Sequence, residues 1–247
     1  MPISSISITK TLFTSNFSLT IRKVHRYLGL FLGIQFLFWT ISGLYFSWTD
    51  LNEIHGDHFK NLDYSPKLFK TLINPSELNI QEGINTIELN DINGVPYYWI
   101  NNSQLYNANN GNIKKNISEK EALYIASKYM IDSMKVSSIE LLEETNNHHE
   151  YRGKPLPAYV ISYSNNNAVK AYVSIKDGKF QTVRHLSWRW FDFLWMTHTM
   201  DYQTRDNFNT TLLRAFSLLG LITVMSGFLL WFVSSTTMRR IFKRNSN

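Results

Sequence analysis

The seven histidines are the main candidates for metal or cofactor ligands in this sequence, because it contains no cysteine. His55 and His58 stand among Asp50, Glu53 and Asp57, and the two imidazoles would share one face of a helix. Imidazole and carboxylate groups in this arrangement could bind a divalent metal. The alternative is a solvated polar segment next to an apolar block.

His25 and His198 are the other candidates, each at the edge of an apolar block. His25 lies between Lys23 and Arg26, which on residue types alone indicates a polar position at a membrane edge. His198 lies in the aromatic segment SWRWFDFLWMTHTM, where a capping or packing histidine is the simplest interpretation. The absence of cysteine excludes disulfides, thiolate catalysis, iron–sulfur clusters and covalent haem attachment. The sequence also lacks the G-x-S-x-G, H-E-x-x-H and glycine-rich phosphate-binding motifs.

Two uncharged apolar blocks would position these histidines. The first runs from Tyr27 to Trp48 and the second from Ala215 to Val233. As helices they would be about 33 Å and 28 Å long, which suits a hydrocarbon core of about 30 Å. We therefore expect two transmembrane helices, with the lipid bilayer as the first partner of the chain.

Basic residues flank both blocks and predict the orientation. They are Arg22, Lys23 and Arg26 before the first block, and Arg239, Arg240, Lys243 and Arg244 after the second. Short basic flanks stay on the cytoplasmic side, so both termini are expected there. Because these cations flank membrane spans and form no recognition motif, nucleic acid is not an expected partner.

Small and aromatic residues add two further expectations. Gly29 and Gly33 form a G-x-x-x-G, a spacing that lets helices approach closely in a homodimer or within one chain. The aromatic segment 187–200 is too polar to span a membrane, which favours an interfacial helix. An ordinary buried helix of the external domain is the alternative.

The residues between the blocks predict an α+β domain with one helix on an antiparallel sheet. Ser118 and Glu121 form a capping box at the start of a helix that should run from Glu119 to about Met130. Short alternating segments bounded by turn residues predict strands. These segments are 95–100, 103–106, 139–142, 159–163, 171–175 and 180–183.

Three segments together resemble the PepSY-associated transmembrane family. They are RKVHRYLGLFLGIQFLFWTISGLYFSW, the helix ISEKEALYIASKYM with the following strands PAYVISYS and KAYVSIKDGKF, and WMTHTMDYQTRDNFNTTLLRAFSLLGLITVMSGFLLW. In that family a basic H-R-x-L-G opens a membrane helix ending in Ser-Gly, and a PepSY domain follows outside. A second helix also ends in Ser-Gly, as at Ser42-Gly43 and Ser226-Gly227 here. The chain looks like a short, two-span form.

The resemblance implies a place in the bacterial inner membrane, with the PepSY-like domain in the periplasm. Its divisions would be a cytoplasmic segment 1–26, spans 27–48 and 211–234, a periplasmic domain 49–186, an interfacial helix and linker 187–210, and a basic cytoplasmic tail 235–247. Some larger relatives look like siderophore-linked iron reductases with haem b held by membrane-edge histidines. His25 and His198 match those positions. One departure is the segment Thr199 to Tyr202, which in the family is often glycine-rich.

The expected topology constrains any haem b. His25 and His198 would lie on opposite sides of a core about 30 Å thick, so they cannot ligate one haem within one chain. His25 then requires a second copy or a partner subunit, whereas His198 could pair with His55, His58 or His185. The expected function is a haem-linked redox accessory of iron or siderophore reduction. The alternatives are a non-enzymatic module that docks a partner through its external domain, and a structural subunit of a larger membrane complex.

Overall fold

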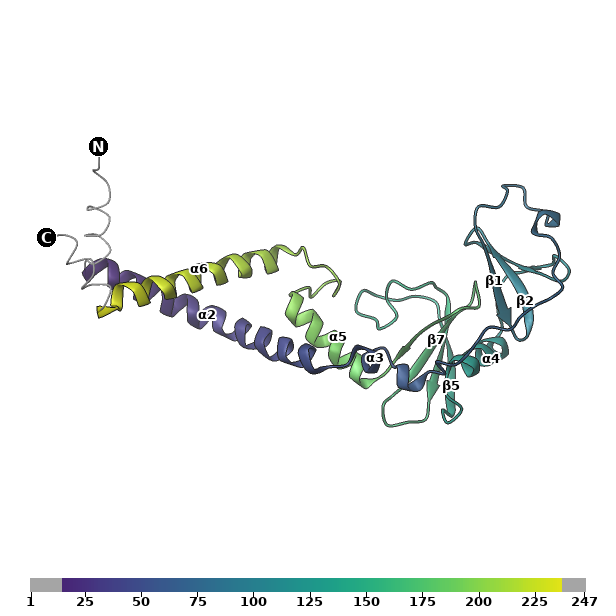
Figure 1. Ribbon diagram of the computed structural model, residues 1–247, viewed down its shortest axis with the longest axis horizontal. Helices are drawn as coiled ribbons and strands as arrows, with labels where there is room; N and C mark the ends of the chain where they lie inside the picture. The colour runs from purple at the N-terminus through teal and green to yellow at the C-terminus, as the bar shows by residue number, and fades with distance from the viewer. Residues whose placement is uncertain (1–14, 237–247) are drawn as a thin grey trace. The chain divides into compact units, whose positions relative to one another are not determined.

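A computed structural model describes residues 15–236 and divides the chain into two compact units. One unit is formed by Met1–Ser47 together with Leu194–Asn247, and the other by Trp48–Phe193. The second unit is a separate domain of two antiparallel sheets and helices, and the first contains two long apolar helices. Figure 1 shows the elements of both units by label and by colour along the chain.

The two apolar helices are α2, Ser15–Trp48, and α6, Thr211–Ser234. Their apolar stretches, Leu19–Trp48 and Thr211–Ser234, are both long and apolar enough to cross a membrane. α2 is helical from the first described residue, Ser15, through Tyr27, and no proline or glycine interrupts the residues between them. The predicted segment 1–26 is therefore partly helical, and the tail 237–247 lies outside the described residues.

α2 and α6 pack against each other in opposite directions, as Figure 1 shows near the start of α2. Phe31 stacks on Phe216 with ring centroids 5.7 Å apart. A Cβ placed on Gly220 would lie 3.2 Å from the Phe36 ring, so this glycine permits the close approach of the helices. By contrast, a Cβ at Gly29 or Gly33 would meet no atom within 4 Å. The contact thus uses a glycine of α6, and the G-x-x-x-G of α2 is left open.

The predicted helix in the aromatic segment is α5, Leu186–Thr199. The boundary between the two units falls within it, after Phe193. The loop that joins α5 to α6 then runs to Thr210, whose hydroxyl accepts a hydrogen bond from the Leu213 N–H at 3.1 Å. That contact caps the start of α6.

The domain contains two four-stranded antiparallel sheets where the sequence predicts one, and this corrects the expected fold. The first sheet has the order β1-β2-β3-β4 and the second β5-β6-β7-β8, so each is a meander. The bounds are β1 Ile87–Ile92, β2 Val95–Ile100, β3 Gln104–Asn107, β4 Ile113–Lys114, β5 Val136–Leu142, β6 Ala158–Tyr163, β7 Lys170–Ser174 and β8 Phe180–Arg184.

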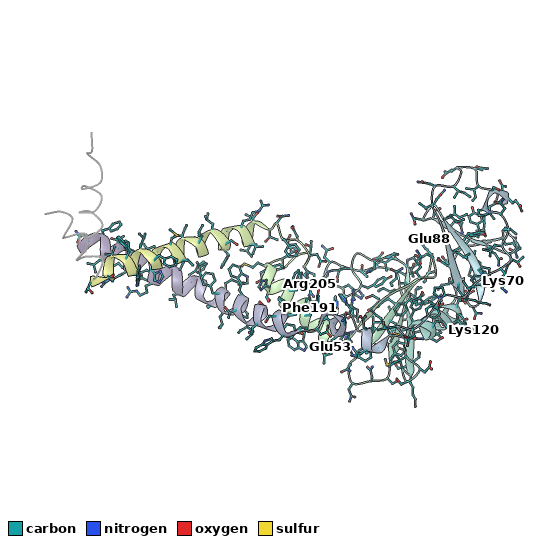
Figure 2. The ribbon with its side chains drawn as sticks, viewed as in Figure 1. Glu53, Lys70, Glu88, Lys120, Phe191 and Arg205 are labelled. Atoms are coloured by element: carbon teal, nitrogen blue, oxygen red, sulfur yellow. The ribbon has the colours of Figure 1, made fainter. Side chains whose placement is uncertain are left out.

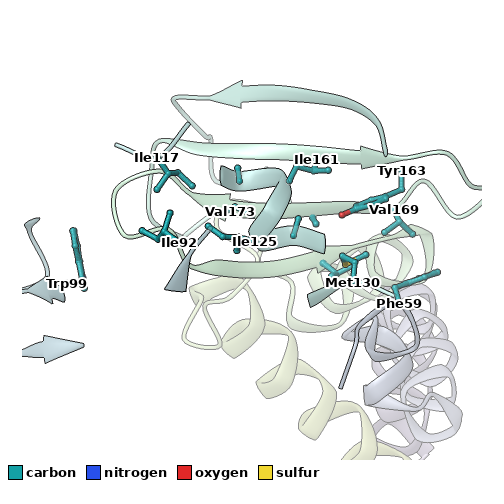
Figure 3. Packing of buried hydrophobic residues seen from close by; sticks show 14 of the residues in the cluster. Phe59, Ile92, Trp99, Ile117, Ile125, Met130, Ile161, Tyr163, Val169 and Val173 are labelled. Atoms are coloured by element: carbon teal, nitrogen blue, oxygen red, sulfur yellow. The ribbon is translucent and has the colours of Figure 1, made fainter. Parts of the chain in front are cut away.

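The helix α4, Glu119–Tyr129, separates the two meanders along the chain. The predicted capping box is confirmed, since the Ser118 side chain accepts from the Glu121 N–H and the Glu121 carboxylate accepts from the Ser118 N–H. Ala122, Ile125 and Ala126 form the buried face of the helix. Figure 3 shows Ile125 of α4 near Ile92 of β1 and Val173 of β7, so the main core draws on both sheets.

Candidate functional site

His25 of α2 is held by a serine of α6. Its Nδ1 atom lies 2.8 Å from the Ser226 Oγ atom. The Ser226 hydroxyl already donates its single proton to the Thr223 carbonyl oxygen at 2.7 Å, in the preceding turn of its own helix. Ser226 can therefore only accept from the ring, which assigns the proton to Nδ1. The Nε2 lone pair of a neutral His25 is then available for a ligand.

The same arrangement recurs at the other end of α2. The Nδ1 atom of His198, at the end of α5, lies 2.7 Å from the Ser42 Oγ atom. Ser42 is fully buried, and its hydroxyl donates to the Phe38 carbonyl oxygen at 2.6 Å. His198 therefore also carries its proton on Nδ1 and presents a bare Nε2. Within the described part of the chain, no hydrogen bond reaches Nε2 of either ring.

The second glycine of α6 makes room for His25. A Cβ at Gly227 would lie 3.2 Å from Cε1 and 4.0 Å from Nε2 of the His25 ring. Gly227 also lines an apolar groove of about 500 Å³, together with Val224, Phe228 and Trp231 of the same helix. The spacing of these four residues places them on one face of α6. The face of α6 that meets His25 therefore continues into an apolar groove.

Additional contacts fix the end of α5 that carries His198. The Trp39 indole N–H donates to the His198 carbonyl oxygen at 2.8 Å, and the Gln35 amide donates to the Thr197 carbonyl oxygen at 3.3 Å. These side chains of α2 satisfy carbonyls that the last turn of a helix leaves free. The Phe46 ring meets the imidazole edge-on, with centroids 5.5 Å apart. His198 is therefore held through its backbone as well as its ring.

The two histidines do not lie together. His25 and Ser42 are 17 positions apart on α2, and His198 is bonded to Ser42. At 1.5 Å per residue, the two imidazoles are separated by about 25 Å along the helix. The prediction that they cannot share one ligand within one chain agrees with this geometry.

A buried aspartate organises the loop after α5. Asp201 is 3% exposed, and its carboxylate accepts hydrogen bonds from the backbone N–H groups of Gln203, Thr204 and Asn207 and from the Thr204 hydroxyl. Burial alone would raise the pKa of Asp201, but these donors together lower it to about 2. The loop thus depends on an ionised Asp201.

The helical face expected for His55 and His58 does not form. The short helix α3, Leu51–Ile54, ends at His55, and Gly56 has a φ of +72°, a left-handed conformation that stops the helix. His58 lies in the following 3-10 helix η1, Asp57–Phe59. No group of three or more His, Asp or Glu side chains suited to a metal occurs within residues 15–236. A metal site on His55 and His58 stays a prediction, but the shared helical face that supported it is not present.

His185 is the buried histidine of the domain. Its Nε2 donates to the Ile54 carbonyl oxygen at 3.1 Å, and its ring packs edge-on against His58 with centroids 5.4 Å apart. Burial lowers the pKa of His185, which favours the neutral ring. His58 and His185, both named as candidate partners for a haem, thus contact each other within the domain.

A buried ionic network that the sequence did not predict ties the start of α5 to the second sheet. The Glu150 carboxylate accepts from the Arg189 guanidinium at 2.6 Å and from the Tyr172 hydroxyl at 2.6 Å. Nearby, Arg152 pairs with Asp192 at 2.6 Å. Burial would raise the pKa of Glu150, but Arg189 and Tyr172 hold it below its usual value. The loop carrying Glu150 has no periodic pattern, so these pairs could not be predicted from the sequence.

Comparison of this chain with family models, with curated proteins and with solved structures finds no match. The PepSY resemblance therefore rests on the sequence motifs alone. The residues that motif reasoning missed are Ser42 and Ser226 as partners of the two imidazoles. The repeated Ser-Gly pair in the two apolar blocks was the available signal.

Proposed function

We propose that this chain is a two-pass protein of the bacterial inner membrane, with α2 and α6 as its spans. The length and apolar character of both helices support this assignment. The basic residues around α2 and after α6 favour cytoplasmic termini by the positive-inside rule. The domain Trp48–Phe193 then lies in the periplasm, and α5 lies at the outer interface.

The function that we propose is haem b-linked electron transfer, as an accessory of iron or siderophore reduction. The observation that carries it is the serine bond to Nδ1 of both His25 and His198, which leaves Nε2 as the ligand atom. Metal-ligating histidines typically donate their other ring N–H to a fixed acceptor, which sets the tautomer and the ring orientation. A haem b bound to these imidazoles would supply reversible one-electron transfer.

A six-coordinate haem needs a second ligand from outside this helix pair. Apart from His25, every histidine of the sequence lies between His55 and His198. His25 is therefore the one histidine at the proposed cytoplasmic end. A second copy of the chain, in a homodimer, or another membrane subunit must supply the missing imidazole. The apolar groove beside Gly227 is open and is lined by one helix, so an apolar ligand lying there would also need a surface from the second chain.

The test is a visible absorption spectrum of the detergent-purified full chain, before and after reduction with dithionite. We expect a Soret band, with sharp α and β bands after reduction. His25→Ala and His198→Ala should each lower the bound haem, whereas His148→Ala, at an exposed loop position, should leave it unchanged. A flat spectrum from cells supplied with haem would reject the proposal, and so would equal haem content in all four proteins.

Partner docking by the periplasmic domain is the second candidate. β5 is an edge strand of the second sheet, and its Val136 and Leu141 side chains are exposed. An open edge with apolar side chains is a template for strand addition by another protein. This candidate predicts a cofactor-free chain and a partner that binds to the β5 edge. Val136→Lys with Leu141→Lys should abolish this binding, whereas Lys115→Glu, a charge change at an exposed residue outside β5, should not.

A further inference from the structure

The charges of this chain are sharply segregated along the sequence. All 19 acidic residues lie between Asp50 and Asp206. Apart from Arg214 in the first turn of α6, eight of the 25 lysines and arginines lie before or after that range. They are Lys10, Arg22, Lys23, Arg26, Arg239, Arg240, Lys243 and Arg244. The sequence before the apolar stretch of α2 and after α6 therefore contains basic side chains and no acidic side chain.

Three of these cations lie within the described part of α2. Arg22, Lys23 and Arg26 are exposed, and none has a carboxylate partner among residues 15–236. The bond from His25 to Ser226 places the final turns of α6 beside this part of α2. The four basic residues of the tail follow α6 directly in the sequence.

The exposed face of α2 changes from cationic to apolar along its length. At 100° per residue, Arg22, Lys23, Arg26 and Tyr27 fall within an arc of about 140°. The exposed side chains that follow on the same arc are mostly apolar, and Leu30, Ile34, Leu37 and Ile41 form an aliphatic stripe among them. Leu30 is 74% exposed, and the Arg26 guanidinium lies 5.3 Å from the Tyr27 ring centroid. This order of cation, aromatic ring and hydrocarbon is complementary to a phospholipid lying along the helix.

We propose that Arg22, Lys23 and Arg26 form a binding site for the headgroup of an anionic phospholipid, whose acyl chains lie along the aliphatic stripe of α2. This site rests on the proposed insertion of α2 and α6 in a membrane. Anionic lipid fits better than nucleic acid or an acidic protein, because the cations continue directly into an exposed hydrocarbon surface. Cations next to a span attract anionic headgroups, by about 1 kcal/mol each near the surface.

The experiment compares headgroups in membranes that contain the full chain. The protein is reconstituted in phosphatidylcholine vesicles with trace spin-labelled phosphatidylglycerol or spin-labelled phosphatidylcholine. Electron paramagnetic resonance then gives the fraction of each label that the protein immobilises. We expect a preference for phosphatidylglycerol of at least about 5-fold, the factor that about 1 kcal/mol from one such cation would give. The preference should fall at high salt, since the Debye length shrinks from about 10 Å at 0.1 M to about 3 Å at 1 M.

The matched variants remove equal charge from two places. Arg22→Gln with Lys23→Gln and Arg26→Gln should reduce the preference to nearly 1. The control changes Lys115, Lys120 and Lys154 to Gln, which are exposed lysines of the domain, and should keep the preference. Figure 2 labels Lys120, whose side chain projects from the domain surface.

The outcomes separate this proposal from the one on which it rests. Extraction with alkaline carbonate tests insertion independently of headgroup preference. Wild-type protein that carbonate releases from membranes would overturn both proposals. Carbonate-resistant protein that holds the two labelled lipids equally overturns the headgroup site alone. The site is also overturned if the triple α2 variant keeps its preference, or if the domain variant loses it.

Discussion

Replacing Asp201 with asparagine tests how strongly one buried carboxylate holds the loop between α5 and α6. Its two oxygens accept four hydrogen bonds, three of them from backbone N–H groups. The amide of asparagine has one acceptor oxygen, and its NH₂ group would face donors. The pKa of Asp201 is lowered from 3.8 to about 2, which corresponds to about 2 kcal/mol of folding stability. We expect Asp201→Asn to cost about that amount.

The direction of this pKa shift determines how the unfolding free energy changes with pH. Because the pKa of Asp201 in the folded chain lies below its unfolded value, the stabilisation is complete above about pH 4 and is lost as the pH falls toward 2. The difference in unfolding free energy between wild type and Asp201→Asn should therefore shrink over that range. Other carboxylates titrate there too, so the difference, rather than either curve, is the quantity to compare.

Chemical denaturation in detergent micelles, followed by tryptophan fluorescence, measures this difference. Trp195 suits the purpose because its ring meets Phe208 of the same loop edge-on, with centroids 5.4 Å apart. Asp132→Asn is the control, since Asp132 is exposed in the domain. The reasoning fails if Asp201→Asn unfolds like wild type at pH 7, or if its deficit is the same at pH 2.5 as at pH 7.

Three further changes test other contacts. Gly227→Ala should displace the His25 ring, because the new Cβ would lie 3.2 Å from Cε1, and should therefore lower the haem content in the absorption assay. Gly29→Ala is the control, because no atom lies within 4 Å of its new Cβ, and it should leave the haem content unchanged. Glu150→Gln should destabilise the domain by about 2–3 kcal/mol in thermal unfolding, because it leaves the Arg189 guanidinium without its carboxylate; an unchanged midpoint would contradict the network. Ser118→Ala should cost about 1 kcal/mol in the same assay through loss of the α4 cap, and a cost near zero would count against it.

The sequence was most informative where local chemistry decides the structure. The capping box at Ser118 and Glu121 predicted the start of α4 correctly, because both contacts lie within one turn. The uninterrupted apolar blocks likewise predicted two long helices. The division into two sheets could not be read in this way. β1, Ile87–Ile92, is exposed over its first three residues and buried only at Ile92, and its apolar–polar alternation breaks at Asp91, so its pairing with β2 was not predicted.

The sequence drew attention to the two histidines of the candidate site but not to the residues that hold them. His25 and His198 stand out at the edges of the apolar blocks, whereas the contact between His25 and Ser226 joins residues 201 positions apart. Such contacts depend on how the helices pack, which no local pattern specifies. The expectation that His55 and His58 share one helical face differs from the structure for a local reason. That prediction assumed a regular helix, which Gly56 stops with its left-handed backbone.

The serine partners also bear on why imidazoles occupy these positions. Ser42 and Ser226 already donate to carbonyls in their own helices, so neither hydroxyl needs a histidine to satisfy its proton. A purely structural contact would be served as well by an apolar side chain, without the cost of a polar ring nitrogen among apolar helices. The arrangement instead fixes the tautomer of each ring and leaves Nε2 unbonded within residues 15–236. An oriented imidazole with a free lone pair is the form that a metal centre requires, and this favours a ligand role at both ends of α2.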